Sequence, residues 1–188
     1  MGPAACATSS RAMTSTTLAD ALKDSALIPE YLEGLAANRS IAAVTATGGL
    51  LPHHIVARRR GAQTILAALI EANPRGAHTA DDTGMLPLHW AAARKAPVEV
   101  VETLLRANPD GAARPDANGM LALHLALANG ARALVVCALL KVDALAARVL
   151  DHAGRLPLHY GAARHAPTVV IHALLAAHPS AILVADGK

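Results

Sequence analysis

Four histidines recur at equal intervals along the chain, and imidazole side chains are common metal ligands. They are His54, His89, His124 and His159, each 35 residues after the one before. Equivalent atoms of stacked helical units lie roughly 8–10 Å apart, whereas the ligands of one zinc ion all lie about 2 Å from it. These histidines therefore cannot share an ion, and no metal site is predicted. We expect them to form hydrogen bonds near turns instead.

The thiol of Cys137 is a second candidate for chemistry, because it could act as a nucleophile beside a histidine. It lies within the apolar run 134–140, and this position predicts a buried, unreactive thiol. The sequence has no glycine-rich phosphate loop and no Ser-His-Asp arrangement. We therefore predict no catalytic residue, no cofactor and no small-molecule substrate, so the protein is not expected to be an enzyme.

The elements that carry the histidines follow the same 35-residue period. Each histidine ends a tetrapeptide that begins with leucine, and columns of glycine and aspartate keep the interval. These columns are Gly49, Gly84, Gly119 and Gly154, and Asp81, Asp116, Asp151 and Asp186. A fixed period of this size predicts a solenoid, in which each unit packs mainly on its neighbours.

One unit, residues 84–118, shows how each copy should fold. Pro87 stands where a first helix can begin, since the first helical N–H has no partner in any case. Pro97 opens a second helix, and Asn108-Pro109 ends it. Residues 110–118 are predicted to form a long polar turn. The inner face of the second helix should carry four residues at helical spacing: Val100, Val101, Leu104 and Leu105.

The stretch Gly84–Ala92 reads Gly-Met-Leu-Pro-Leu-His-Trp-Ala-Ala, which resembles the ankyrin repeat and its Thr-Pro-Leu-His-x-Ala signature. The resemblance covers residue 48 to the end and implies an all-α solenoid of stacked helix-turn-helix units with hairpin-like loops. It also implies a structural role for the four histidines and for Gly84, Gly119 and Gly154. Two features differ from the family pattern: each unit is longer than the usual 33 residues, and leucine replaces the threonine at positions 51, 86, 121 and 156.

The period also predicts how the chain is divided. Residues 1–16 are expected to form a flexible tail, and residues 17–47 a degenerate N-terminal capping repeat with Tyr31 and Leu35 on one helical face. Residues 48–188 form the array, with units of about 49–83, 84–118, 119–153 and 154–188. Residues 182–184 should expose apolar surface.

Composition narrows the classes of partner and the compartment. The chain is 53% hydrophobic and 16% charged, with a net charge of only +3, so nucleic-acid binding is not favoured. Residues 166–185 lack acidic and basic side chains, but the repeat register explains them as one unit, so no membrane span is predicted. Cys6 and Cys137 make no disulfide framework, which favours a reducing intracellular compartment such as the cytoplasm.

Residues at two places in each unit are predicted to contact a partner. A column at the end of the first helices is mostly basic, and the resemblance places it on the concave face. Guanidinium groups there would favour an acidic partner, although cations at a helix C-terminus are also favoured by the helix dipole alone. This column comprises Arg59, Arg94, Asn129 and Arg164, and the hairpin positions are Asp82, Thr83, Met85, Asn118, Met120, His152 and Arg155.

The column directly after the histidines holds larger side chains, Ile55, Trp90, Leu125 and Tyr160. Core packing is the favoured interpretation, with partner contact as the alternative. Taken together, the sequence predicts a non-catalytic scaffold that binds a protein partner on its concave face. The alternatives are a structural or adaptor segment of a longer protein and, less favoured, a binder of nucleic acid or another polyanion through a basic stripe that includes Arg58-Arg59-Arg60 and Arg94-Lys95.

Overall fold

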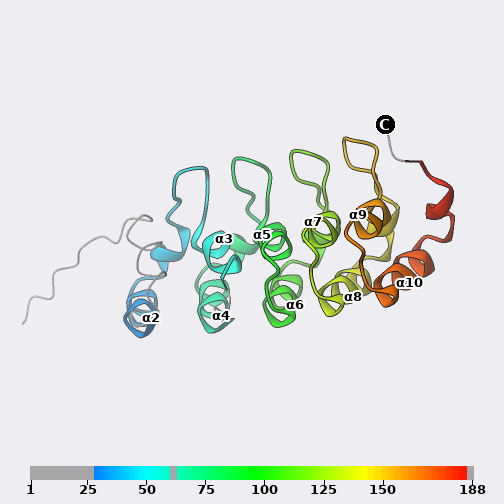
Figure 1. The fold of residues 1–188 in the computed structure, drawn as a ribbon. Coiled ribbons are helices and arrows are strands. Elements are labelled where there is room, and N and C mark those ends of the chain that lie inside the picture. The colour runs from blue at the N-terminus through cyan, green and yellow to red at the C-terminus, as the bar shows by residue number, and fades with distance from the viewer. Residues whose placement is uncertain (1–27, 60–62, 186–188) are drawn as a thin grey trace, which may run out of the picture.

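The computed structural model describes residues 28–59 and 63–185, and every regular element in these ranges is helical. The helices form two rows, with hairpin loops projecting from one of them (Figure 1). The predicted all-α architecture of stacked helix pairs is therefore confirmed. The tail predicted for residues 1–16, together with Cys6, lies outside the described ranges.

The row nearer the hairpins consists of short helices that begin 35 residues apart (Figure 1). Proline occupies the first helical position in three of them, where its fixed backbone angle suits a helix start. In the third unit an alanine takes this position without displacing the start of the helix. These helices are α3 (Pro52–Ala57), α5 (Pro87–Ala93), α7 (Ala122–Ala128) and α9 (Pro157–Ala163).

The second row consists of longer helices that lie on the side of the first row away from the hairpins (Figure 1). On α6 the residues Val100, Val101, Leu104 and Leu105 are all buried, which confirms the predicted inner face. The first helix in the described ranges, α2, packs on α4, and its residues Tyr31 and Leu35 are buried. The row comprises α2 (Ile28–Ala37), α4 (Gln63–Ala72), α6 (Val98–Ala107), α8 (Ala133–Val142) and α10 (Thr168–Ala177).

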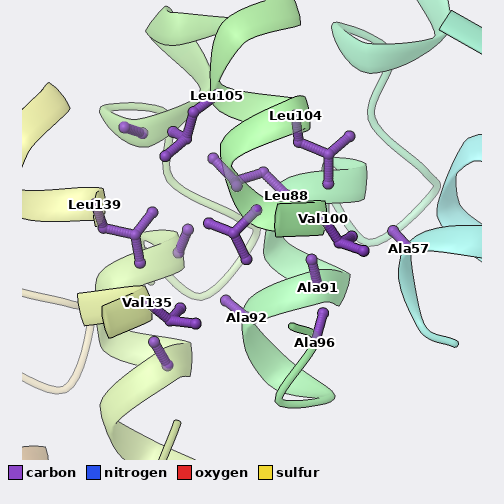
Figure 2. Packing of buried hydrophobic residues seen from close by; sticks show 14 of the residues in the cluster. Ala57, Leu88, Ala91, Ala92, Ala96, Val100, Leu104, Leu105, Val135 and Leu139 are labelled. Atoms are coloured by element: carbon purple, nitrogen blue, oxygen red, sulfur yellow. The ribbon is translucent and has the colours of Figure 1, made fainter. Parts of the chain in front are cut away.

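Small side chains hold the two rows close together. Figure 2 shows Ala91, Ala92 and Ala96 set between the longer side chains of Val100 and Val135, and all five are buried in one hydrophobic cluster. Alanine on the first helices lets neighbouring backbones approach, so the core does not depend on aromatic residues.

The long polar turn predicted after each second helix is wrong in part, because it begins with a short 3-10 helix. In the second unit Gly111 and Ala112 are buried there. Because these two residues are small, the 3-10 helix packs closely against the array. The chain therefore passes through a buried segment before it reaches the exposed hairpin. The 3-10 helices are η2 (Arg39–Ala43), η3 (Pro74–Ala77), η4 (Pro109–Ala112), η5 (Ala144–Arg148) and η6 (Pro179–Leu183).

The prediction that Cys137 is buried is also wrong. Its thiol is exposed, because α8 turns Val135, Val136 and Leu139 inward and leaves position 137 on the opposite side. Leu134 of the same helix is 65% exposed. The outer surface of α8 therefore carries apolar side chains, beside the charged Lys141 in its last turn.

Each hairpin is shaped by an aspartate and a glycine. Asp81 accepts backbone hydrogen bonds from Thr83 and Met85 through Oδ1, at 2.9 and 3.0 Å. Gly84 adopts a φ of +76°, and a Cβ there would lie 2.9 Å from the backbone nitrogen of Ala117 in the next hairpin. A side chain at this position would thus both strain the turn and separate adjacent hairpins.

At the C-terminal end of the array, the apolar exposure expected at residues 182–184 is present at the first two positions, whereas Val184 is half-buried. Ile182 and Leu183 of η6 are 72% and 85% exposed. The same end carries an apolar hollow of about 350 Å³ that is lined by Leu158, Gly161 and Ile171, among others. Among the described residues, no helix has the length and apolar character needed to cross a bilayer.

Two non-glycine residues with positive φ lie just past the first helices and give a stability prediction. Lys95 and His165 adopt φ of 55° and 50°, whereas the equivalent position of the third unit is Gly130 with φ 66°. A left-handed conformation costs a side-chain-bearing residue about 1–2 kcal/mol, and the freedom of glycine in the unfolded chain offsets part of this. Lys95→Gly should therefore raise the free energy of unfolding by about 0.5–1 kcal/mol, measured by urea denaturation. Gly130→Lys is the matched control and should lower it; stabilisation by both changes would contradict the argument.

Candidate functional site

The four column histidines hold the array together through both ring nitrogens. His89 accepts the backbone N–H of Leu86 at Nδ1 (2.9 Å) and donates from Nε2 to the carbonyl of Arg114 (3.0 Å). Since Nδ1 accepts, the ring proton must lie on Nε2. The bond at Nδ1 satisfies the backbone N–H of Leu86, the N-cap residue, which is the half of a capping box that the third helical residue contributes. It does not replace the bond that a threonine hydroxyl at position 86 would accept from the first turn of the helix. The equivalent bonds of the other units join His54 to Leu51 and Met85, His124 to Leu121 and Arg155, and His159 to Leu156 and Val184.

His54, His89 and His124 are neutral in the folded array. Burial lowers the pKa of His89 to about 4, although Asp116 and the Arg114 carbonyl oppose this change. Burial also lowers the pKa of His54 and of His124. Because both ring nitrogens of each of these histidines already form hydrogen bonds, none of the rings has a lone pair free for a metal ion or a substrate. Within residues 28–59 and 63–185, no three His, Cys, Asp or Glu side chains form a group that could hold a metal ion.

The hairpin residues predicted to contact a partner form a row along one edge of the molecule. Backbone hydrogen bonds join each hairpin to the next, from Ala117 to Thr83 (3.1 Å) and from His152 to Asn118 (3.0 Å). The row is accessible: Asp82, Thr83, Asn118 and His152 are exposed, and Met85, Met120 and Arg155 are half-buried.

The column at the ends of the first helices is less uniform than the sequence suggests. Arg94 and Arg164 are exposed and Arg59 is half-buried. The side-chain amide of Asn129 donates to the carbonyl of Leu125 at 2.8 Å, so its polar group is turned back onto its own helix. The basic character of the column is thus interrupted at the third unit.

The structure brings Arg59 and Arg94 together at a surface hollow of about 420 Å³, which we call the arginine hollow. Its lining residues come from the first hairpin, from the end of α3 and from the end of α5, and Arg164 is not among them. They are Ala46, Thr47, Leu50, Ile55, Arg58, Arg59 and Arg94.

Trp90 lies beside the arginine hollow. The favoured interpretation of the sequence placed this side chain in the core. It is only half-buried, and the guanidinium groups of Arg58 and Arg94 lie over its ring, 4.4 and 5.9 Å from the ring centroid. The core interpretation is therefore wrong for Trp90, whose indole N–H bonds to Asp81 at the hairpin (2.8 Å). The other members of this column, Ile55, Leu125 and Tyr160, are half-buried and pack against the core.

A similar arrangement recurs in the fourth unit. The hydroxyl of Tyr160 donates to Asp151 (2.6 Å), and Arg155 lies 5.7 Å from the centre of the tyrosine ring. Hydrogen bonds from Tyr160 and from the hairpin backbone hold the pKa of Asp151 below its usual value, although burial by itself raises it. In both units, therefore, an aromatic side chain donates a hydrogen bond to the hairpin aspartate and has an arginine guanidinium over its ring.

Arg58 was predicted to bind only nucleic acid, in the less favoured alternative, and not a protein partner, although its guanidinium lies nearer to the Trp90 ring than that of Arg94 does. The sequence does carry a signal for it. The equivalent positions in the other three units are Ala93, Ala128 and Ala163, so Arg58 is the exception in a column of alanines. Its contact with Trp90 joins two units and cannot be read from either unit alone.

Comparison with known proteins supports the assignment of the repeat. The family model described as ankyrin repeats (many copies) matches residues 88–140, which run from α5 into α8. No curated protein matches the chain. The match identifies ankyrin repeats in residues 88–140, and similar helix pairs and projecting hairpins recur on both sides of this segment. Ankyrin repeats generally mediate protein–protein interaction.

Proposed function

We propose that the array is a non-catalytic scaffold that binds an acidic segment of a partner protein on its concave face. The observation that carries this proposal is the arginine hollow, where Arg58, Arg59 and Arg94 converge next to the exposed row of hairpin residues. Guanidinium groups pair well with carboxylates and other planar or multidentate anions. A surface that is already fixed by packing and hydrogen bonds loses little conformational freedom when it binds.

The helix dipole offers a competing reason for basic residues at these positions, and the chain provides controls that separate the two explanations. Arg106 and Lys141 also stand in the last turns of helices, α6 and α8, and Arg148 ends η5. All three are exposed but belong to the second helices and the segments that follow them. Reversing their charge removes the same favourable interaction with helix ends without touching the arginine hollow.

The prediction compares two triple variants of the full chain. Changing Arg59, Arg94 and Arg164 to glutamate should abolish capture of partner proteins from cell extract, because the surface would then repel acidic segments. Changing Arg106, Lys141 and Arg148 to glutamate should leave capture unchanged. Quantitative affinity capture followed by protein identification measures both, and circular dichroism verifies that helical content is retained. Equal capture by the two variants would contradict the proposal, and capture dominated by nucleic acid that is lost steeply with added salt would favour polyanion binding.

A further inference from the structure

The arginine hollow contains a guanidinium group whose position is fixed before any ligand arrives. Arg58 lies over the ring of Trp90, and the ring is itself held by the bond from its indole N–H to Oδ2 of Asp81. The other oxygen of Asp81 accepts the backbone N–H groups of Thr83 and Met85. This series of contacts runs from the hairpin backbone to Arg58, so little side-chain freedom remains to be lost on binding.

The positive charge in the hollow is concentrated. Arg58 and Arg94 share one aromatic ring, and Arg59 lines the same hollow. Burial and the neighbouring charge of Arg94 both lower the pKa of Arg58, which means that the surroundings disfavour its cation. Both oxygens of the nearby Asp81 carboxylate already accept hydrogen bonds from Trp90 and the hairpin. An incoming anion would relieve the repulsion between the arginines.

Two or more guanidinium groups suit a phosphate monoester better than a carboxylate. A carboxylate has two oxygens, which one arginine can occupy with its two parallel N–H groups. A phosphorylated side chain has three terminal oxygens and a charge of about −1.5 to −2, so it can bond to Arg58 and Arg94 at once. Clusters of arginines are a general means of recognising phosphorylated peptides.

The remaining walls of the hollow indicate what accompanies the phosphate. Ala46, Leu50 and Ile55 are apolar and belong to the first hairpin and α3. At about 420 Å³ the hollow exceeds the size of a phosphate group and has the size of a small-ligand site. It can therefore also admit the carbon chain of the modified residue and a neighbouring apolar side chain.

We propose that the arginine hollow binds a phosphorylated serine or threonine of the partner segment through Arg58 and Arg94, with Trp90 as the support of Arg58. This inference rests on the proposed function and specifies the residue that the scaffold recognises. The observations that carry it are the position of both guanidinium groups over the ring of Trp90 and their presence in the lining of one hollow.

The test uses three fluorescein-labelled pools of degenerate peptides that differ only in a fixed central residue: phosphoserine, glutamate or serine. Binding to the full chain is measured by fluorescence anisotropy at constant ionic strength. We expect the phosphoserine pool to bind at least tenfold more tightly than the glutamate pool, and the serine pool to bind least. The chain has a single tryptophan, so an unlabelled phosphoserine pool should also change the emission of Trp90 in a saturable way.

Variants assign the binding to the hollow. Arg58→Gln and Arg94→Gln should each weaken binding of the phosphoserine pool at least tenfold. Arg106→Gln removes the same charge from the exposed end of α6 and should leave binding unchanged. Circular dichroism of all three variants verifies the fold, and unchanged binding by Arg58→Gln would overturn the inference.

The remaining outcomes separate this inference from the proposed function. Equal affinity for the phosphoserine and glutamate pools would overturn phosphate recognition and leave the acidic-partner proposal standing. Failure of every pool to bind would also overturn it, while the triple charge reversals test the proposed function independently. A single-stranded oligonucleotide that binds more tightly than the phosphoserine pool would overturn it in favour of nucleic acid.

Discussion

Replacing His89 with leucine is expected to lower the free energy of unfolding by about 3 kcal/mol. The imidazole caps α5 by accepting the N–H of Leu86 and binds the carbonyl of Arg114. Leucine fills a similar volume but leaves both backbone groups without these partners. The cost is about 1–3 kcal/mol for the buried N–H of Leu86 and less for the part-buried carbonyl of Arg114. Urea denaturation followed by circular dichroism measures the change.

The neighbouring unit provides a matched control in which the same substitution should have the opposite sign. His53 stands in the core, where the equivalent residues of the other units are Leu88, Leu123 and Leu158. Its Nδ1 has no hydrogen-bond partner, and its Nε2 lies 3.2 Å from the carbonyl of Leu69, which already accepts the N–H of Asn73. His53→Leu should therefore stabilise the array by about 1–2 kcal/mol. Destabilisation by His53→Leu as large as that by His89→Leu would show that burial alone, and not hydrogen bonding, decides the role of these rings.

Acidification from pH 7 to pH 4 should weaken the array by on the order of 3 kcal/mol for each of His53 and His89. Burial lowers the pKa of both rings to about 4, from an ordinary value of 6.5. A group whose pKa is depressed in the folded state must release a proton that the unfolded chain keeps. This contribution to stability is complete above pH 6.5 and is lost as the pH falls toward 4.

The surrounding charges act in different directions on the two rings. His54 lies next to His53 and lowers its pKa further after burial, whereas the carboxylates of Asp116 and Asp81 favour protonated His89 and Arg114 opposes it. Asp81 and Asp151 have pKa values below the usual 3.8, because hydrogen bonds outweigh burial. The two carboxylates therefore stabilise the array above their usual pKa of 3.8. This stabilisation is lost only as the pH falls below about 4, after the histidines have titrated.

Urea midpoints at pH 7, 5.5 and 4.5 test this dependence, with His53→Leu as the control. Leucine at position 53 cannot titrate, so the variant should lose less stability than the parent chain over the same interval. An identical pH dependence in the two proteins would show that His53 does not contribute to acid sensitivity.

The arrangement of helices could be predicted from the sequence because its signals are local. Proline at the start of α5 and the spacing of Val100, Val101, Leu104 and Leu105 on α6 act within one unit. The same signals recur at each period, so every copy supports the others. The match to ankyrin repeats agrees with this interpretation.

The exposure of Cys137 could not be predicted because α8 is apolar nearly all round. When residues on both faces are hydrophobic, as Leu134 and Val135 are, helical periodicity no longer identifies the inner face. Only the packing of α8 against α6 and α10 decides which residues are covered.

The arginine hollow could be predicted only in part, because it is formed between units. Arg59 and Arg94 share a column, so their proximity follows from stacking. The contact of Arg58 with Trp90 joins the end of α3 to the middle of α5, and no local pattern encodes it. The replacement of alanine by Arg58 in its column marks the position without revealing the partner.

The single backbone bonds between hairpins also bear on how the molecule responds to force. Successive hairpins are joined from Asp82 to Gly48, from Ala117 to Thr83 and from His152 to Asn118, whereas the helices behind them share continuous apolar packing. The edge of the array that carries the hairpins is thus less stiff than the helical side. Bending the array should therefore change the spacing between hairpins more than the spacing between helices. Under tension applied to the two ends of the array, the repeats should unfold one at a time, because each repeat contacts mainly its neighbours.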